Sequence, residues 1–317
     1  MDLLTIGGDL FDSERDAEVL RPKLRRMFRG NPFEILAIPG NHDKEAYSAN
    51  LDFGSDLKIV TTEPCEIRSY DRVSVVAVPY QDRPSDKLLG ELENAAKGTQ
   101  TRILLIHCTL DIGFTGQDFG EEATKIYFPV TAETLSRLNY DYILAGHFHV
   151  QTCKKSLNGN QHFIYPGSPI SHTKKEEGKR QVVLIDTEKR DTTGIFLDSF
   201  YYDSLQLYVR PGKEEKTLEA LKQWATLHSA DRCELEAIVT GFLKISEVEF
   251  RKALESIGKN VEILHAYRNV ERVLSHPLYK RFLEKLEADE EIEDKEKVED
   301  FVIDAMSRLL ADRKLRE

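Results

Sequence analysis

Four polar clusters in the first half of the chain come directly after short apolar runs. They are Gly8-Asp9 with Phe11-Asp12, Gly40-Asn41-His42-Asp43, His107, and Gly146-His147-Phe148-His149. Ligand sites in α/β sheets collect at the carboxyl ends of strands. Four such ends that deliver carboxylate, amide and imidazole groups therefore predict one converging site. The glycines allow sharp turns and a close approach of the backbone to a bound group.

The side chains of these clusters are typical ligands of a borderline-hard divalent ion. A carboxylate, an amide oxygen and several imidazoles, with no thiolate among them, favour an ion such as Mn²⁺ over a structural zinc. An aspartate can bridge two ions that lie about 3.5–4 Å apart, and such a pair clamps a phosphoryl group and lowers the pKa of a bound water. The clusters are therefore suited to two-metal chemistry on a phosphate ester.

Each cluster taken alone also has a purely structural explanation. Asp9 could cap a turn, and His107 could be a hydrogen-bonded histidine of the core. The sequences GNHD after a run that ends in Pro39-Gly40, and GHFH after YDYILA, are more specific. The order and context of all four clusters together favour a functional site.

The elements that must position these residues follow an alternating pattern of strands and helices. Short apolar runs closed by glycine or proline are typical of buried strands in a layered α/β fold. Helical spacing of apolar residues predicts a helix over Asp16–Phe28, which Pro22 could kink or delay. Strands are expected at Leu3–Gly7, Glu34–Ile38, Val73–Val78, Arg102–Ile106, Tyr142–Ala145, His162–Tyr165 and Gln181–Asp186.

The pattern changes near Ser199 to a second, smaller α/β unit. Ser246 and Glu249 have the spacing of a capping box at the start of its second helix, and Gly258 fits the end of that helix. Two amphipathic helices follow from about Arg272. The expected elements of the β-α-β-α-β unit are Leu205–Arg210, Glu214–His228, Cys233–Phe242, a helix from Ser246, and Val261–Ala266.

Composition limits the class of protein. With 317 residues, 40% hydrophobic and 31% charged, the chain is globular rather than disordered or fibrous. No apolar run approaches the roughly 18 residues of a membrane helix, and the start lacks the basic region of a signal peptide. Four widely spaced cysteines favour free thiols in a reducing cytoplasm. The net charge of −11 means that any polyanion must be met by a local basic surface.

The segments GDLFD, IPGNHD, LLIHC, YDYILAGHFH and YPGSP occur in this order. With them, the chain up to about Thr187 resembles the calcineurin-like metallophosphoesterases, most closely the SbcD-type nucleases of double-strand-break repair. The resemblance implies an α/β (α+β) fold with a two-sheet β-sandwich flanked by helices. We expect this phosphoesterase domain over residues 1–195, a capping domain over 196–271 and a helical tail over 272–317.

The resemblance also implies roles for single residues. Asp9 matches the aspartate that bridges two metal ions. Asn41, His107 and His147 match ligands of one ion, and His149 matches a ligand of the other. His42 matches the histidine that contacts the scissile phosphate and assists the leaving group. Its neighbour Asp43 could orient it.

One motif of that family is missing. An Asp-x-His should lie a few tens of residues before GDLFD, but only eight residues precede Asp9 and none is histidine. Asp9 and His149 then leave the second ion with two protein ligands, so we expect its site to be incomplete. We also expect that the chain is truncated and that a functional form begins upstream with a strand, an Asp-x-His and a helix. The alternative is a natural pseudoenzyme.

Two basic clusters could contact phosphates. The first, which begins at Arg21 and ends at Arg29, is better explained as a solvated helix face. The second follows the YPGSP turn and lies nearer the predicted site, so phosphate contact is as good an explanation there as a solvated surface. Its residues are Lys174, Lys175, Lys179 and Arg180.

The leading functional hypothesis is two-metal hydrolysis of DNA phosphodiester bonds in DNA repair, as an exonuclease, an endonuclease or both. The resemblance implies two Mn²⁺-class ions, a homodimer, an SbcC-like ATPase partner that the tail helices could bind, and a cytoplasmic protein with no membrane contact. One alternative is a small-substrate phosphoesterase of the same superfamily. Another is a catalytically impaired structural subunit, which the missing Asp-x-His favours.

Overall fold

The computed structural model describes residues 2–47, 51–95, 100–111, 127–150, 152–228 and 232–314. The chain divides into two compact units, Met1–Tyr202 and Asp203–Glu317. Each unit has hydrophobic clusters of its own.

Two main sheets form the first unit. Their strands are β1 (Leu3–Ile6), β2 (Glu34–Ala37), β3 (Leu57–Ile59), β4 (Glu66–Ser69), β5 (Val73–Ala77), β6 (Thr101–His107), β9 (Tyr142–Gly146), β10 (Cys153–Asn158) and β11 (Gln161–Tyr165). The smaller sheet is parallel, in the order β1-β2-β3. The larger has the order β10-β11-β9-β6-β5-β4, with four parallel inner strands and an antiparallel strand at each edge.

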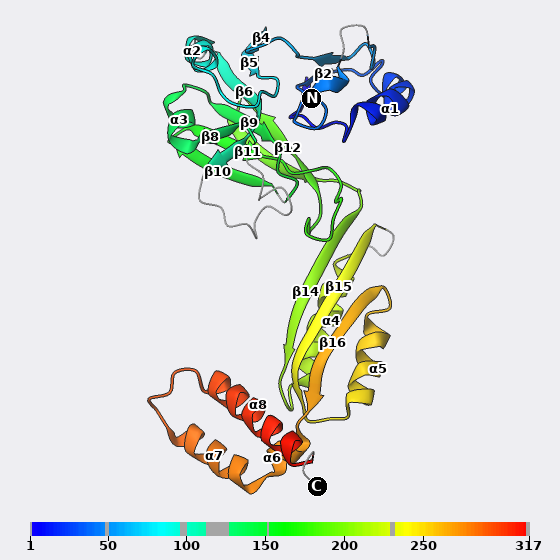
Figure 1. The fold of residues 1–317 in the computed structure, drawn as a ribbon, viewed down its shortest axis with the longest axis vertical. Coiled ribbons are helices and arrows are strands. Elements are labelled where there is room, and N and C mark those ends of the chain that lie inside the picture. Colours follow the sequence, from blue (N-terminus) through cyan, green and yellow to red (C-terminus); the bar gives the residue numbers. More distant parts are fainter. Residues whose placement is uncertain are drawn as a thin grey trace. The chain divides into compact units, whose positions relative to one another are not determined.

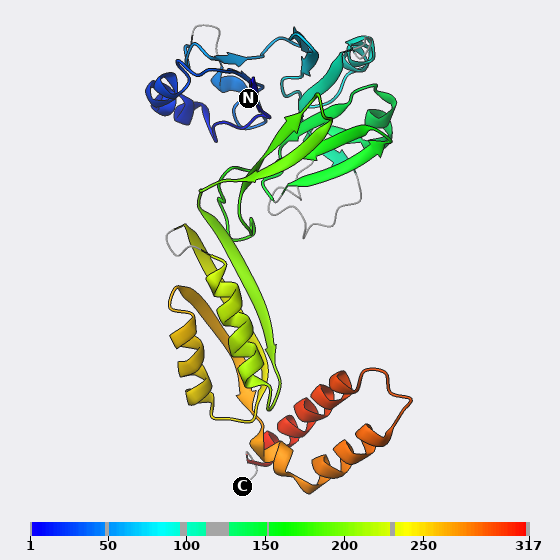
Figure 2. The same ribbon diagram turned by 180° about the vertical axis from the view of Figure 1, so that it is seen from behind.

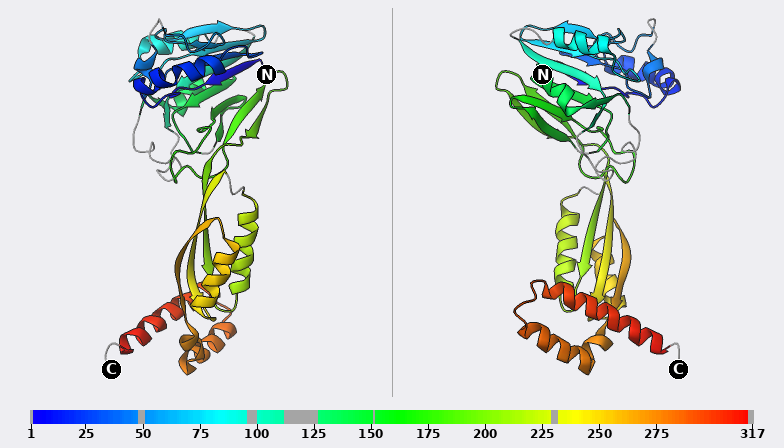
Figure 3. Two further views of the ribbon diagram at one scale, coloured as in Figure 1. Left: turned by 90° about the vertical axis from the view of Figure 1, so that its right-hand side faces the viewer. Right: turned by 60° about the vertical axis from the view of Figure 1, so that its left-hand side comes forward.

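The two sheets pack face to face, and helices cover their outer faces (Figure 1, Figure 3). Leu36 and Ile38 from the smaller sheet meet Val75, Leu105 and Ile164 from the larger one in a single buried cluster. Fully burying a side chain of this kind contributes about 1.5–3 kcal/mol. The structure therefore confirms the predicted two-sheet sandwich flanked by helices.

The helix α1 (Glu14–Met27) covers the smaller sheet. The hydroxyl of Ser13 accepts a hydrogen bond from the N–H of Asp16, so the helix begins two residues earlier than its apolar spacing predicts. Pro22 lies inside the helix and does not end it. Ala17 faces the apolar cluster of that sheet, whereas Val19 and Met27 are exposed.

The outer face of the larger sheet packs against α2 (Asp86–Ala95) and α3 (Ala132–Arg137), which contribute Leu88, Leu92 and Leu135 to the largest buried cluster. An antiparallel ribbon of β12 (Gln181–Asp186) and β13 (Asp191–Phe196) adds Val183 and Ile185 to the edge of the cluster between the sheets. The remaining short elements are η1 (Lys44–Ala46), β7 (Thr109–Asp111) and β8 (Pro129–Thr131).

The second unit has the predicted β-α-β-α-β order. Its elements are β14 (Tyr201–Val209), α4 (Glu214–Thr226), β15 (Cys233–Leu243), α5 (Glu247–Ile257) and β16 (Val261–Asn269), with the strands in the order β14-β15-β16. Leu221 of α4 and Phe250 of α5 share one core with Val239 of the sheet, and α4 lies along the strands (Figure 2). The predicted capping box is not formed, because the Ser246 side chain makes no capping hydrogen bond.

Three helices complete the second unit: α6 (Glu271–Ser275), α7 (Pro277–Ala288) and α8 (Lys295–Lys314). Tyr279 and Ile303 pack with Phe242 at the end of β15. Arg210 pairs with Asp300 at 3.2 Å, which also joins α8 to the sheet region. The tail helices are therefore packed against the strands of their own unit, yet three of their apolar side chains stay exposed, namely Leu278, Phe301 and Leu309.

Two further expectations concern the chemistry of the whole chain. All four cysteines are free thiols, as their spacing predicts. None of the described helices has the length and apolar character needed to cross a membrane.

Candidate metal centre

The carboxyl ends of four strands meet at one edge of the two sheets. The residues found there are Asp9 after β1, Asn41 and His42 after β2, His107 at the end of β6, and His147 after β9. The ring of His147 lies 5.4 Å from that of His107, measured between centroids. Packing of the smaller sheet on the larger one therefore brings together residues that are up to 138 positions apart in the chain, from Asp9 to His147.

The orientation of the His107 ring is set by a backbone carbonyl. Nδ1 lies 2.8 Å from the carbonyl oxygen of Gly7, and because that oxygen can only accept, Nδ1 donates. In the neutral ring, Nε2 then has the lone pair. Nε2 lies 2.8 Å from Oδ1 of Asn41 and 3.3 Å from Oδ2 of Asp9. Three electron-pair donors thus face one another in a buried place.

This arrangement fits a divalent metal ion. Adjacent ligands of an octahedral ion at about 2.1 Å lie about 3.0 Å apart, and the two separations at Nε2 bracket that value. An imidazole, a carboxylate and an amide oxygen also suit a borderline-hard cation. Asp9, Asn41 and His107 are therefore the residues placed to hold one ion, with His147 beside them.

The charge state of Asp9 suits the same role. Burial has the largest influence and would raise the pKa of Asp9. The hydrogen bond and charge that His107 offers when its ring is protonated, together with the N–H of His42 at 2.9 Å from Oδ1, outweigh it and lower the pKa below its usual value. Asp9 is therefore ionised at neutral pH and available to a cation.

The backbone at the centre adopts conformations that most residues avoid. Asp9 has φ 53° and His147 has φ 111°, and such residues cost on the order of 1–3 kcal/mol each. Glycines make the close approach possible: a Cβ on Gly146 would lie 1.9 Å from the carbonyl oxygen of Gly7, and one on Gly40 would lie 2.0 Å from Oδ1 of Asp9. The strand ends can therefore meet only if these two positions lack side chains.

Asp43 ties the loop after β2 to the loop after β1. Its Oδ1 accepts from the N–H of Gly40 at 2.7 Å, and its Oδ2 accepts from the N–H of Leu10 at 2.8 Å and the hydroxyl of Tyr47 at 2.5 Å. Burial raises the pKa of Asp43, although the Tyr47 hydrogen bond partly offsets this effect. These contacts act on the two loops, so Asp43 positions the backbone from which Asp9 and His42 project.

The ring of His42 is oriented by Asp12, to which sequence analysis assigned no role. Nδ1 of His42 lies 3.1 Å from Oδ1 of Asp12, and the His42 side chain is 32% exposed. The signal for Asp12 is present in the sequence as the second aspartate of GDLFD. A carboxylate partner at Nδ1 fixes the imidazole tautomer and leaves Nε2 to face a substrate.

His149 is held by a second network. Its Nδ1 lies 3.4 Å from Oε1 of Glu176, whose Oε2 also accepts from the N–H of His172 at 2.8 Å. Burial would raise the pKa of Glu176, but the hydrogen bonds and charge of His149 and the His172 N–H lower it. Glu176, which sequence analysis missed, therefore orients His149 as an ionised carboxylate. Its only sequence signal is its place after the YPGSP turn.

Arg180 is part of that network and does not lie on a surface. It is 2% exposed, and its guanidinium donates to the carbonyl oxygens of His149, Val150 (3.1 Å) and Ser168 (3.0 Å). A buried guanidinium with these partners is not placed to contact DNA, which corrects the expectation for this residue. Lys174, Lys175 and Lys179 are exposed, and phosphate contact by them stays a prediction.

Arg180→Ala should lower the free energy of unfolding by about 3 kcal/mol or more, because several buried carbonyl oxygens lose their donor at once. Lysine at this position should not restore stability, since it lacks the planar set of donors. Urea denaturation is the measurement, and Lys179→Ala is the matched control, expected to change stability by less than about 0.5 kcal/mol. Equal stability of Arg180→Ala and the parent would contradict this assignment.

The predicted second ion has less support in the geometry. Among the residues that the structure describes, His, Cys, Asp and Glu side chains form no group of three or more that could hold a metal ion. The cluster at Asp9 reaches three donors only by including the Asn41 amide. The residues present therefore fit one ion better than two.

Comparison with known proteins agrees with this geometry. Residues 1–151 match the family model of the calcineurin-like phosphoesterases. The match spans Asp9, Asn41, His107 and His147, and it supports that superfamily and, in general terms, a hydrolase that acts on phosphate esters with divalent metal ions. No curated protein matches the chain.

Proposed function

We propose that the chain is a metal-dependent phosphodiesterase that cleaves DNA, of the SbcD-like type found in DNA repair. The observation that supports it most is that Oδ1 of Asn41 and Oδ2 of Asp9 both lie within 3.3 Å of Nε2 of His107. A bound ion of the Mn²⁺ class would polarise a phosphoryl oxygen and lower the pKa of its water.

The chain's own residues then have distinct tasks. Asp9, Asn41 and His107 hold the ion, and His147 lines the same site. Asp12 accepts from Nδ1–H of His42, and when the ring is protonated at both nitrogens its Nε2–H is left to pass a proton to the leaving oxygen. Asp43 holds the loop after β1 and the loop after β2 together through its hydrogen bonds to their backbones.

The test compares three substrates at matched Mn²⁺. The proposal expects cleavage of a linear DNA duplex and of bis(p-nitrophenyl) phosphate, with no comparable action on p-nitrophenyl phosphate. A preference for the monoester would instead support the small-substrate alternative. DNA binding without cleavage of either diester would support the impaired structural subunit, which the weak geometry for a second ion favours.

We also propose an ATPase partner of the SbcC-like type for the tail. Leu278, Phe301 and Leu309 are 62%, 74% and 65% exposed, and large apolar side chains on a helix surface are suited to a partner helix. Phe301→Asp combined with Leu309→Asp should abolish capture of such an ATPase. Unchanged capture would reject this surface, and Glu284→Ala on α7 is the control expected to have no effect.

A homodimer in a reducing cytoplasm completes the proposal. The exposed Val19 and Met27 of α1 are apolar side chains that a second copy could cover. Light scattering of the parent and of Met27→Glu would test this idea, because a monomeric parent contradicts it.

A further inference from the structure

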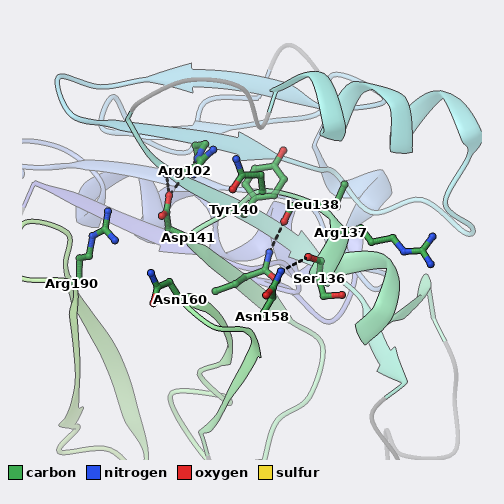
Figure 4. A pocket seen from close by; sticks show the side chains of 11 residues that line it. Arg102, Ser136, Arg137, Leu138, Tyr140, Asp141, Asn158, Asn160 and Arg190 are labelled. Atoms are coloured by element: carbon green, nitrogen blue, oxygen red, sulfur yellow. Dashed lines mark hydrogen bonds and ion pairs between the residues drawn. The ribbon is translucent and has the colours of Figure 1, made fainter.

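A polar groove lies at the opposite ends of the strands from the candidate metal centre. His107 ends β6, whereas Arg102 stands at the start of β6, Asp141 precedes β9 and Gln161 begins β11. These three residues line a cavity of about 520 Å³ (Figure 4). A smaller cavity of about 170 Å³ shares Asp141, Asn160 and Arg190 with it, so the two are neighbours.

The size of the groove suits a small ligand, because sites for such ligands measure about 300–1,000 Å³. Its position also separates it from the metal centre, since the two sites use opposite ends of the same strands. A ligand could therefore bind in the groove without touching Asp9, Asn41 or His107.

Three arginines line the larger cavity, and two of them form ion pairs with acidic side chains. Arg102 is 3.4 Å from Oδ2 of Asp141, and Arg137 pairs with Glu133. Arg190 makes no ion pair or hydrogen bond with any of the described residues. Arg190, on the turn between β12 and β13, is thus the one of these three arginines that no acidic side chain of the described residues holds in an ion pair (Figure 4).

The backbone of Arg190 is held in a conformation that glycine would adopt more easily. Its φ is 55°, at the end of a tight turn in which Oδ1 of Asp186 accepts from the N–H groups of Glu188 (3.1 Å) and Lys189 (2.9 Å). A residue with a side chain at such a position strains the backbone and lowers the stability of the fold relative to glycine. An arginine there points to a use for its guanidinium.

The smaller cavity adds a flat surface beside this charge. The His162 ring stacks on Tyr142 with a centroid distance of 5.7 Å and an interplanar angle of 27°. Tyr142 is buried beneath it, whereas His162 is half-buried and lines the cavity together with Arg190. A planar heterocycle can stack on such a ring, as bases do on aromatic side chains.

We propose that this groove is a second, non-catalytic site that binds a nucleoside monophosphate. The guanidinium of Arg190 and the amide of Asn160 take the phosphate, because the arginine fork matches phosphate oxygens. The base stacks on His162. Arg190 lines both cavities, so one ligand can contact the Arg190 guanidinium through its phosphate and the His162 ring through its base.

The experiment is calorimetric titration of the full chain with 5′-AMP, adenosine and inorganic phosphate, in EDTA so that a metal centre cannot bind phosphate. The proposal expects 5′-AMP to bind at least about tenfold more tightly than either fragment. Arg190→Ala should weaken 5′-AMP binding by about tenfold or more. His162→Ala should bring the affinity for 5′-AMP down to that for phosphate.

Two variants separate loss of the ligand contact from loss of fold. Arg190→Gly removes the guanidinium and relieves the backbone strain, so its melting temperature should not fall while 5′-AMP binding is lost. Lys189→Ala, next to it in the same turn, should bind 5′-AMP like the parent. The proposal is overturned if the parent does not bind 5′-AMP at millimolar concentration, or if Arg190→Gly binds it as well as the parent. Asn41→Ala should bind 5′-AMP normally, which keeps this test independent of the proposed catalytic function.

Discussion

His42→Ala should reduce cleavage of a DNA phosphodiester by about 10²- to 10⁴-fold while the affinity for Mn²⁺ stays near that of the parent. The reason is the geometry of the ring: Nδ1 is paired with Asp12 at 3.1 Å, and the ring is assigned to proton delivery and not to metal binding. Steady-state cleavage rates and calorimetric Mn²⁺ titration measure the two effects separately.

The leaving group provides an internal control for this prediction. A p-nitrophenolate leaves without needing a proton, so His42→Ala should lose far less activity on bis(p-nitrophenyl) phosphate than on DNA. Asp12→Asn should lower the rate of DNA cleavage by about tenfold in the parent. In the His42→Ala variant the same substitution should not lower the rate further, as expected for two residues that act as a unit. Simultaneous loss of Mn²⁺ binding and activity would make His42 a metal ligand instead.

His107→Ala should lower the affinity for Mn²⁺ by about 100-fold or more, and with it the activity at limiting metal. Loss of groups that only support a ligand already costs about 10- to 100-fold, and Nε2 of His107 is itself one of the three convergent donors. Because His107 is buried, its removal also destabilises the fold. Asn41→Ala, at a partly exposed position, is therefore the companion variant and should also lower the affinity for Mn²⁺.

The matched control for both metal variants is His276→Ala, which removes a histidine from the second unit, where it caps α7. Its Mn²⁺ affinity should equal that of the parent. If His107→Ala and Asn41→Ala also retain full Mn²⁺ affinity, the assignment of this centre as a metal site is wrong.

Much of the fold could be predicted because its main strands are buried runs that end in glycine or proline. The expected Tyr142–Ala145 strand differs from β9 by one residue, and the Glu34–Ile38 strand differs from β2 by one residue. The strands β3 and β4 are among those that were not predicted, together with β7, β8, β10 and β13. Strands β3 and β4 have only three and four residues, with alternating burial, so their sequences lack a continuous apolar run. Such strands form because a neighbouring strand offers hydrogen bonds, which is a property of the sheet.

The types and order of the candidate ligands were determined by sequence alone. Asp9, Asn41, His107 and His147 each follow or end a strand, and parallel strands of packed sheets must bring such ends to one edge. That reasoning needs only the pattern of strands and the residue that follows each one.

Only the tertiary structure decided which polar groups are partners. Asp43 contacts the loop after β1, Asp12 holds His42, and Arg180 is buried against the backbone of His149. Proximity in sequence suggested different roles for Asp43 and Arg180. The physical reason is that a hydrogen bond requires a separation near 3 Å and a suitable direction. Those two quantities are set by how loops from separate strands pack, and residues 31 or 33 positions apart have no fixed distance until the chain has folded.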